Sequence, residues 1–259
     1  MKKILIIPDT QVTPDSNTDH LEALGNYAVK HKPDIIVHLG DHWDMKSLSS
    51  YDQGRLANEG TRYQDDILAG IKAMQRLLLP IQMDQNKSRE QKKRQYTPRK
   101  VFLLGNHEER IKRHIQAYPY LNGKLSYNDL MLFQMGFEVY GYLEPVEIEG
   151  IYFSHYWVNP DSAKKMPFSS NIDLQLSKLG FSFVQGHKQG LRTASPRYLP
   201  NGKVLRGLIA GSFYQENLEY MGPQGNPHWR GAIQLNEVDG SGWFSPLELS
   251  VDYLLRECI

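Results

Sequence analysis

The stretch "DIIVHLGDHWD", residues 34–44, sets an apolar run directly before a glycine and two acids. A continuous run of Ile, Val and Leu is typical of a parallel strand that is buried on both faces. An acid at the end of such a strand is costly to bury unless a cation or a set of hydrogen bonds compensates it. The stretch therefore predicts a buried strand whose carboxyl end carries a polar site.

Two further stretches repeat this pattern of an apolar run that ends in polar residues. The sequence "KKILIIPDTQVTPD", residues 2–15, precedes the first, and "KVFLLGNHEERIKRHI", residues 100–115, follows it. Between the first two runs, residues 18–32 place apolar side chains on one helical face and stop before a proline, with Thr18 or Asp19 as a candidate N-cap. A strand, a helix and a strand within about 40 residues predict a βαβ unit with parallel strands.

The remaining sequence predicts one more long helix and a second group of strands. Apolar residues at the helical period predict a helix over residues 61–83. Neither a repeat of fixed period nor a long linker divides the chain, so we predict a single α/β domain over residues 1–259, built from two sheets. Strand-like stretches with Gly-rich turns cover residues 146–157, 180–190, 204–215 and 230–240.

Composition excludes several classes of protein. The chain of 259 residues has 30 Lys and Arg against 29 Asp and Glu, so any nucleic-acid surface must be a local patch. Its one cysteine, Cys258, excludes a disulfide within the chain and a cysteine zinc cage. No run approaches the ~20 apolar residues of a membrane helix, and the first run is too short for a signal peptide. We expect a cytoplasmic protein without a membrane partner, and we find no signal for an oligomeric state.

Polar side chains follow five of the apolar runs. Ligands of α/β sheets bind at the carboxyl ends of the strands, so these side chains should meet. Each one alone is more typical of a turn, a helix cap or a satisfied histidine, but five such strand ends in one chain favour a shared site. Carboxylates, imidazoles and amide oxygens are ligands of Mn²⁺, Fe²⁺ or Zn²⁺. The residues are Asp9 and Gln11, Asp41 and Asp44, Asn106 and His107, His155, and His187 with Gln189.

The ordered motifs resemble the signature of the calcineurin-like metallophosphoesterases. That family carries D-x-H, G-D-x-x-D, G-N-H-E, a single H and G-H-x-H in this order. The present chain has "DTQ" at 9–11, "GDHWD" at 40–44, "GNHE" at 105–108, "SHYW" at 154–157 and "GHKQ" at 186–189. The resemblance covers most of the chain, and it implies a two-sheet β-sandwich flanked by helices, a four-layer fold with a two-metal site at one edge.

The resemblance also implies a role for each matching residue. Asp41 would bridge two divalent ions. His107 would bind phosphate and protonate the leaving oxygen, and Asp44 would orient His107. The first ion would be held by Asp9, Gln11, Asp41 and Gln189, and the second by Asp41, Asn106, His155 and His187.

Glutamine stands at positions 11 and 189, where the family commonly has histidine, and both positions map to the first metal. Some manganese-dependent nucleotide pyrophosphatases of the superfamily carry Gln at the first of these positions. An amide oxygen is a harder and weaker donor than imidazole, so we expect Mn²⁺, with Mg²⁺, Fe²⁺ or Zn²⁺ as alternatives, and a loosely bound first ion. The alternative is that one glutamine only hydrogen-bonds a bound water.

The implied chemistry is hydrolysis of a phosphate ester. Two metal ions about 3.5–4 Å apart supply an activated hydroxide and positive charge where oxygen charge accumulates. We therefore predict a metal-dependent phosphodiesterase acting on nucleic acid or nucleotides, with a nuclease, on DNA or RNA, as the favoured member. The alternatives are a phosphomonoesterase, on protein or small molecules, and a non-catalytic metal-binding scaffold. The intact pair His107 and Asp44 argues against the scaffold.

Three residues are candidate substrate contacts. Protein phosphatases of the superfamily continue G-D-x-x-D with Arg-Gly, whereas Met45 follows here, which favours the diesterase over the monoesterase. Lys46 offers a point charge but no bidentate fork. His42 either reaches substrate or packs beside Trp43. Arg110, which follows "GNHE" in the next helix, is the stronger candidate for a phosphate contact.

A basic stretch at residues 86–100 is either a track for a nucleic-acid backbone or a solvated surface. It precedes a strand, so we expect it to lie a strand length from the metal site. The Gly- and Pro-rich segment 213–231, which contains His228, is either a wall of the substrate site or a packing element. Candidate stacking surfaces for bases are Tyr96, Tyr214, Tyr220 and Trp229.

Overall fold

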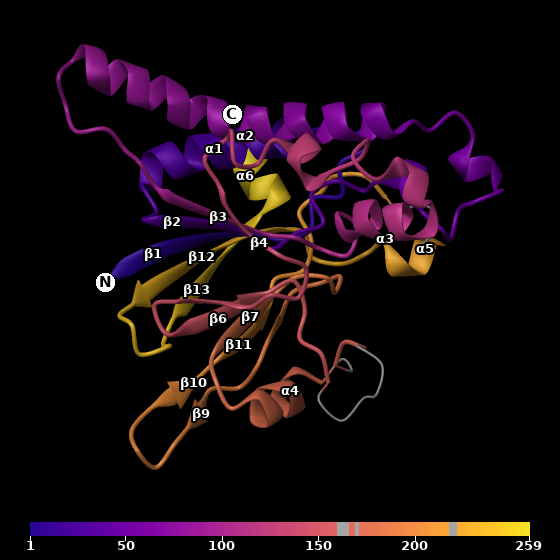
Figure 1. The fold of residues 1–259 in the computed structure, drawn as a ribbon. Coiled ribbons are helices and arrows are strands. Elements are labelled where there is room, and N and C mark those ends of the chain that lie inside the picture. Colours follow the sequence, from indigo (N-terminus) through magenta and orange to yellow (C-terminus); the bar gives the residue numbers. More distant parts are fainter. Residues whose placement is uncertain (160–165, 169–170, 218–221) are drawn as a thin grey trace.

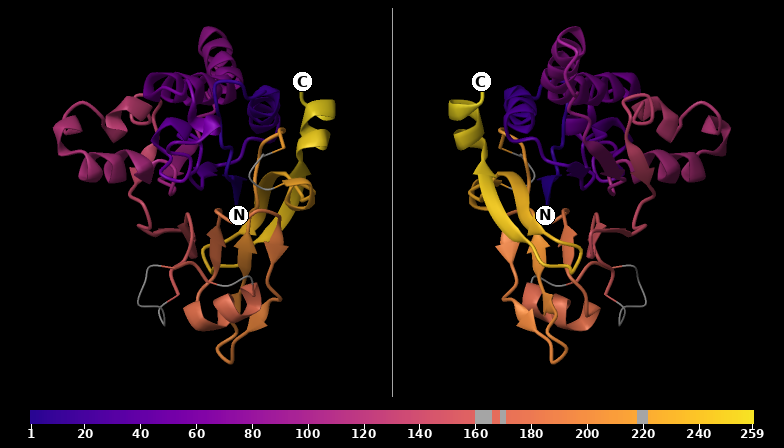
Figure 2. Two further views of the ribbon diagram at one scale, coloured as in Figure 1. Left: turned by 90° about the vertical axis from the view of Figure 1, so that its right-hand side faces the viewer. Right: turned by 90° about the vertical axis from the view of Figure 1, so that its left-hand side faces the viewer.

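The computed structural model describes residues 1–159, 166–168, 171–217 and 222–259, and it arranges them in four layers (Figure 1). Two β-sheets lie face to face in the middle, as the side views in Figure 2 also show. Helices cover the outer face of the larger sheet, and one helix covers the outer face of the smaller sheet. The predicted two-sheet sandwich flanked by helices is therefore confirmed.

The larger sheet has six strands and contains the first three apolar runs. Strands β1 to β4 run parallel to one another, whereas β12 pairs antiparallel with both β1 and β13. The predicted βαβ unit is present, since β1 and β2 pair in parallel across the first helix. In spatial order the strands are β13 (Ser245–Ser250), β12 (Gly231–Val238), β1 (Lys2–Ile7), β2 (Ile35–His38), β3 (Arg99–Leu103) and β4 (Glu138–Tyr140).

The smaller sheet has five strands. Its middle strands β6, β7 and β11 are parallel, and an antiparallel strand flanks them on each side. A separate hairpin pairs β9 (Arg197–Tyr198) with β10 (Val204–Leu205). In spatial order the sheet contains β5 (Val146–Ile148), β6 (Ile151–Ser154), β7 (Phe183–Gln185), β11 (Gly207–Ile209) and β8 (Arg192–Thr193).

The helices divide between the outer layers and the edge of the sandwich. Three of them, α1, α2 and α6, pack on the larger sheet, and α4 packs on the smaller one. Short 3-10 turns lie between β2 and α2 and between α3 and β4. The helices are α1 (Asp19–His31), α2 (Tyr63–Glu90), α3 (Glu109–Ala117), α4 (Ile172–Leu179), α5 (Gly222–Gly225) and α6 (Val251–Glu257), and the turns are η1 (Lys46–Leu48), η2 (Leu56–Asn58), η3 (Pro119–Leu121) and η4 (Tyr127–Leu130).

Alternation along the central strands explains their continuous apolar character. On β1, Leu5 and Ile7 face the helical layer, whereas Ile4 and Ile6 face the smaller sheet. All four are fully buried. Because both faces of the strand lie in a core from Ile4 onward, these four positions exclude water, and the run stays apolar until the strand ends.

Helix α2 is longer than the sequence predicts. The apolar period ends near residue 83, but the helix continues through Pro80 to Glu90. It crosses α1 at Gly25, where a Cβ atom would lie only 2.3 Å from the carbonyl oxygen of Leu77. The close crossing holds the middle of α2 on the sheet, and the last turns project beyond it (Figure 1).

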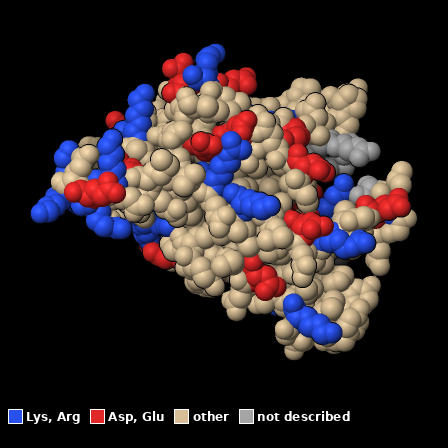
Figure 3. All heavy atoms as spheres, turned by 90° about the horizontal axis from the view of Figure 1, so that it is seen from above, with Lys and Arg blue, Asp and Glu red and all other residues tan. Residues whose placement is uncertain are grey.

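The basic stretch at residues 86–100 lies at that projecting end. In Figure 3, which looks down on α2, Lys and Arg gather at the far left tip of the molecule. Figure 1 places this tip at the amino ends of the parallel strands. Tyr96 is half-buried there, packs against the helical core and donates its hydroxyl to the carbonyl of Pro33. The stretch is solvated and lies a strand length from the predicted metal ligands, as expected from the sequence.

Within the described residues, no helix combines the length and the apolar character that a bilayer crossing requires.

Candidate metal centre and active site

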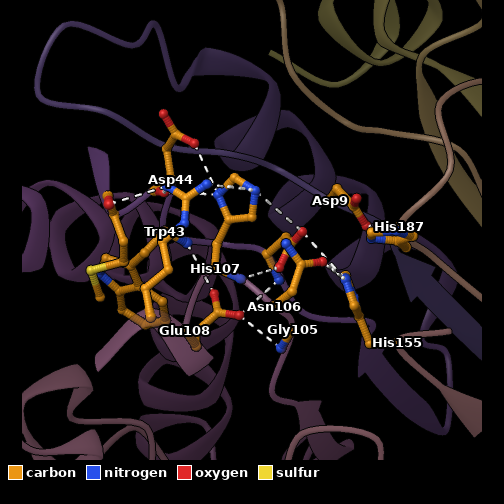
Figure 4. Close-up of polar contacts among 12 residues, drawn as sticks. Asp9, Trp43, Asp44, Gly105, Asn106, His107, Glu108, His155 and His187 are labelled. Carbon is orange, nitrogen blue, oxygen red and sulfur yellow. Dashed lines mark hydrogen bonds and ion pairs between the residues drawn. The ribbon is translucent and has the colours of Figure 1, made fainter. Parts of the chain in front are cut away.

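The predicted ligands meet where the carboxyl ends of both sheets come together. Asp9, Asp41 and Asn106 follow β1, β2 and β3 of the larger sheet, and His155 and His187 follow β6 and β7 of the smaller sheet. Figure 4 shows the side chains from the two sheets side by side. The site therefore depends on both sheets and on their registration.

Glycines of the motifs make room for the carboxylates. A Cβ atom on Gly105 would lie 2.1 Å from Oδ1 of Asp41, and one on Gly186 would lie 2.5 Å from Oδ1 of Asp9. Any larger residue would push these acids out of place. The glycines that open "GNHE" and "GHKQ" are thus steric requirements of the two buried acids.

Three predicted ligands adopt the left-handed backbone conformation that favours glycine. The φ angles are +43° for Gln11, +50° for Asp41 and +66° for His187. This conformation costs a residue with a side chain roughly 1–2 kcal/mol. Such strain gathers at functional sites because the surrounding structure maintains a side-chain direction that function needs.

The second half of the centre is a preformed set of ligand atoms. Atoms of Asp41, His155 and His187 lie within 4.8 Å of one another, a geometry that fits a metal ion. Nδ1 of His155 donates to the carbonyl of Leu39 (2.8 Å), so Nε2 is the nitrogen that faces the centre. It lies 2.9 Å from Oδ1 of Asn106 and 3.3 Å from Oδ2 of Asp41. The four predicted ligands of the second ion are therefore brought together.

The first half contains buried oxygens without hydrogen-bond donors. Among the described residues, Oδ2 of Asp9 and Oε1 of Gln11 are buried and have no partner. Oδ1 of Asp9 accepts the backbone N–H of His187 (3.0 Å). A buried oxygen without a partner costs about 1–3 kcal/mol. A cation that binds these oxygens would remove that cost, and carboxylate and amide oxygens are suitable ligands for it.

Gln189 is held by a tyrosine. Its Oε1 accepts the hydroxyl of Tyr214 (2.9 Å), and that hydroxyl also lies 3.2 Å from Nε2 of His228. An amide oxygen has two lone pairs, so this bond leaves one of them for a metal ion. The assignment of Gln189 to the first ion stays a prediction.

Burial and mutual repulsion set the charges of the two acids. Burial, together with the charge of Asp41, raises the pKa of Asp9 to about 7. Burial also opposes ionisation of Asp41, but His155 and His107 outweigh it and hold the pKa of Asp41 below its usual range. Burial lowers the pKa of His187 to about 4, which keeps that imidazole neutral and able to ligate. A cation would ionise Asp9 as well.

His107 and Asp44 form the predicted catalytic pair. Nδ1 of His107 lies 2.9 Å from Oδ1 of Asp44 and 2.8 Å from its carbonyl oxygen. Burial opposes a charge on the ring, but Asp41 and Asp44 outweigh it and raise the pKa of His107. Arg110 donates to the carbonyls of Asp44 (2.7 Å) and Met45 (3.2 Å), and its Nη2 lies 3.4 Å from Nε2 of His107. The guanidinium predicted to contact phosphate therefore lies beside the histidine.

Glu108 holds the loop that carries Asp41 and Asp44, a role that the motif alone does not reveal. Its side chain is fully buried and accepts four backbone N–H groups at 2.7–3.1 Å. Figure 4 shows the carboxylate below His107, between the two loops. The four donors belong to Gly105, Asp41, His42 and Trp43. The sequence carries no signal for this role, since Glu108 reads only as the residue before a helix.

The structure places His42 in packing and not at the substrate. The side chain is fully buried, Nδ1 lies 2.7 Å from the hydroxyl of Thr10, and Nε2 lies 2.9 Å from the carbonyl of Gly70. The ring meets Trp43 edge to face. The prediction of a substrate contact by His42 is wrong, because both of its nitrogens are already used.

A cleft of about 890 Å³ opens above the catalytic pair. Its walls come from the loop after β1, from residues 44–55 and from residues 214–217. The two other predicted substrate contacts, Lys46 and Arg110, line it together with His107. Both cations and acids line the walls, so the cleft as a whole is not a purely basic groove.

The segment after β11 forms one wall of the cleft, and its aromatic side chains pack inward. Tyr214 is 2 % exposed and lies under the guanidinium of Arg230, so it offers no stacking face. Both ring nitrogens of His228 have polar neighbours, namely the hydroxyls of Ser212 and Tyr214 and the carbonyl of Gly225. Trp229 is half-buried against the inter-sheet core. Tyr220 lies outside the described residues.

Comparisons with known proteins relate the chain to one family of enzymes. The sequence model of the calcineurin-like phosphoesterases matches residues 2–207. The chain is 23% identical to the Gene 54 protein of Mycobacterium phage L5, over 92% of this chain and 90% of that protein, and 23% identical to the Gene 54 protein of Mycobacterium phage D29, over 93% and 90%. Among solved structures, Yfce, a phosphoesterase from E. coli, superposes with a TM-score of 0.40 and 12% identity over 96% of this chain and all of that one.

Proposed function

The chain belongs to the calcineurin-like phosphoesterase family, and we propose that within this family it is a metal-dependent phosphodiesterase that acts on nucleic acid or nucleotides. Membership of the family makes it a phosphoesterase with divalent ions. The choice of a diester over a monoester, and of Mn²⁺ over other ions, is our proposal. It is supported by the shape of the cleft and by the oxygen-rich first half of the centre.

Seven residues would hold two divalent ions, and the orphaned oxygens of Asp9 and Gln11 support this fit. When bound, such ions supply an activated water and positive charge at the phosphoryl oxygens. The amide and carboxylate oxygens of the first half suit Mn²⁺ or Mg²⁺ better than Zn²⁺. The ligands would be Asp9, Gln11, Asp41, Asn106, His155, His187 and Gln189.

His107 would deliver the proton that the leaving oxygen requires. Asp44 engages Nδ1, which orients the ring and leaves Nε2 to carry a proton toward the substrate. Burial opposes a charge on this ring, but Asp41 and Asp44 outweigh it and raise the pKa of His107, which favours the protonated form. General acid catalysis of this kind contributes about 10²–10⁴-fold. Arg110, fixed by two backbone carbonyls, would contact a phosphoryl oxygen beside Nε2.

The size of the cleft is the observation that carries the choice of a diester. About 890 Å³ is in the range that holds a drug-sized ligand and is far more than a phosphate needs. His107 lines this space, so a substrate held at His107 would have room for a second ester group. The residue after "GDHWD" is Met45, which has no guanidinium and is fully buried.

A monoesterase remains the second candidate because of Arg110. A guanidinium 3.4 Å from His107 is placed to bind the terminal oxygens of a monoester as well. The two activities differ in whether a second ester group is required, so a direct comparison of substrates separates them.

The experiment compares hydrolysis of bis-p-nitrophenyl phosphate, p-nitrophenyl phosphate, single-stranded DNA, duplex DNA and cyclic dinucleotides in the presence of Mn²⁺. We expect the diesters to be preferred and His107→Ala to lose about 10³-fold in kcat while still binding metal. Exclusive cleavage of the monoester would establish the second candidate. No turnover with any metal would leave a binding scaffold.

A further inference from the structure

A second pocket adjoins the catalytic cleft on the side of α3. Its volume is about 260 Å³, and it lies between residues 47–58 and one face of α3 with the following tyrosine. Three residues, Ser49, Tyr51 and Arg110, line both this pocket and the cleft. The second pocket is therefore the immediate neighbour of the space at His107.

The second pocket is lined by cations and hydroxyls and, among the described residues, by no acid. Arg110, Arg113 and His114 supply basic groups from one helix face, and serines supply hydroxyls from the opposite wall. The acid nearest to this wall in sequence, Asp52, lines the catalytic cleft instead and accepts the hydroxyl of Ser49. The pocket thus differs in charge from the cleft, which has acids on its walls.

Neither arginine forms a close ion pair with a carboxylate of the described residues, although the charge of Arg110 acts on Asp44 and Asp66. In the part of the chain that the structure describes, the ion pairs of Lys and Arg with carboxylates include neither Arg110 nor Arg113. Arg110 is held by backbone carbonyls, and Arg113 rests over the ring of Tyr142 (5.5 Å). Both side chains line the small pocket from adjacent helical turns, so two positive charges lie near it, which suits an anion such as phosphate.

Tyr51 stands between the two spaces with its side chain free for contact. The residue is 79 % exposed although it lines both the cleft and the pocket. An exposed ring beside a phosphate site is the arrangement on which a nucleobase stacks, and such stacking contributes about 1–3 kcal/mol per base.

We infer that the second pocket is a subsite for the phosphate next to the scissile one, so that the preferred substrate is a nucleic-acid strand and not an isolated diester. The scissile phosphate would lie at His107 and Arg110, the adjoining nucleoside at Tyr51, and the next phosphate at Arg113. The inference rests on the proposed phosphodiesterase function and adds the class of substrate.

The test uses chromogenic nucleotides that fix the scissile bond. Thymidine 5′-(p-nitrophenyl phosphate) and thymidine 3′-(p-nitrophenyl phosphate) are each prepared with and without a phosphate on the other hydroxyl. In the wild-type protein we expect the added phosphate to raise kcat/KM about tenfold in one of the two polarities. Arg113→Gln should abolish this gain. Lys112→Gln removes the same charge from an exposed residue on the same helix that does not line the pocket, and it should retain the gain.

Two outcomes would overturn the subsite while the diesterase stands. One is hydrolysis of both parent compounds with no gain from the added phosphate in either polarity. The other is a gain that persists in Arg113→Gln, which would place the second phosphate elsewhere. Equal loss on all substrates would show that Arg113 acts only through the fold.

A binding measurement decides the case in which no diester is hydrolysed and the proposed function fails. Calorimetry then compares thymidine 3′,5′-bisphosphate, thymidine monophosphates and inorganic phosphate. Tighter binding of the bisphosphate by about tenfold, lost in Arg113→Gln, would support the subsite. Binding of inorganic phosphate as tight as that of the bisphosphate would show a free-anion site and overturn the inference about substrate.

Discussion

The two halves of the metal centre differ in how firmly the protein holds their ligands. In the second half, Nδ1 of His155 is fixed by the carbonyl of Leu39, and Nε2 already faces Asn106 and Asp41. In the first half, Oδ2 of Asp9 and Oε1 of Gln11 have no donor among the described residues, and the amide of Gln189 is turned to Tyr214. The fold therefore prepares the second site and leaves the first to be completed by its ion.

This difference has a physical origin in the ligands. An imidazole has a second nitrogen through which the backbone can fix its tautomer and orientation. A glutamine has more rotatable bonds and no such handle, so its position costs more side-chain entropy when an ion binds. We expect one tight and one weak ion for this reason.

Asp41→Asn tests the residue that both halves share and should have the largest effect. The substitution keeps the shape and tolerates the left-handed backbone, but it removes the bridging charge. Since partners outside the ligand shell already contribute about 10–100-fold, we expect kcat/KM on bis-p-nitrophenyl phosphate to fall at least about 10³-fold. Calorimetry should show loss of both Mn²⁺ sites. Asp65→Asn, on the exposed side of α2, is the control, and retention of two sites would contradict a shared Asp41.

Glu108→Gln tests whether the loop that carries Asp41 is held from below. The amide of Gln would set a donor against backbone N–H groups that now share one carboxylate. Loss of these charge-assisted bonds should lower the free energy of unfolding by about 3 kcal/mol. Urea denaturation measures this change, with Glu59→Gln as the exposed control. A loss below about 0.5 kcal/mol would show that the loop is fixed by other contacts.

Gln11→His asks whether the weakness of the first half comes from its amide. Histidine accepts a positive φ more readily than most residues, and it restores the donor common in the family. We expect affinity of the weaker site for Zn²⁺ to rise about 10–100-fold, measured by competition with a chromophoric chelator. Gln75→His places the same side chain on the exposed face of α2. An unchanged weaker site would mean that Gln11 only hydrogen-bonds a water.

Tyr214→Phe should have the smallest effect, because it removes only the hydroxyl that orients Gln189. We expect the weaker Mn²⁺ site to lose about tenfold in affinity and the tighter site to be unchanged, as calorimetry would show. Tyr198→Phe, at a 75 % exposed ring, controls for the loss of a hydroxyl. If both sites weaken alike, Tyr214 supports the sandwich as a whole and not Gln189.

The central fold follows from the sequence because the end of each central strand is visible as a change from apolar to polar residues. An apolar run on β1, β2 or β3 must stop where water or a ligand begins, and the polar residue that stops it is visible in the chain. The same rule brought Asp9, Asp41, Asn106, His155 and His187 to one edge of the sandwich. These residues were predictable because position along a strand determines position in space.

Contacts between loops are less visible in the sequence. His42 stands next to a ligand in the motif, yet Thr10 and Gly70, which are distant in sequence, take both of its nitrogens. Glu108 carries no mark of the four backbone groups that it accepts. Such roles depend on which backbone N–H groups lack partners, and that is known only when the loops are placed.

The end of α2 shows a second limit of pattern reading. Periodicity predicts the helix only while apolar residues face a core, but the polar turns after residue 83 continue as a helix in solvent. Good helix formers and the hydrogen bonds of the preceding turns are enough to extend it. The basic segment consequently ends up far from the catalytic pair, whereas the shorter basic face of α3 lies next to it.

The predicted ligands come from both sheets: Asp9, Asp41 and Asn106 from the larger, and His155 and His187 from the smaller. An ion bound among them would therefore hold the two sheets together. A substitution in the apolar interface between the sheets could shift them slightly without unfolding the protein. Such a shift would register first as poor metal retention. Metal retention would therefore measure how well the two sheets are aligned. Catalysis would depend in turn on packing in an interface that lies far from the site.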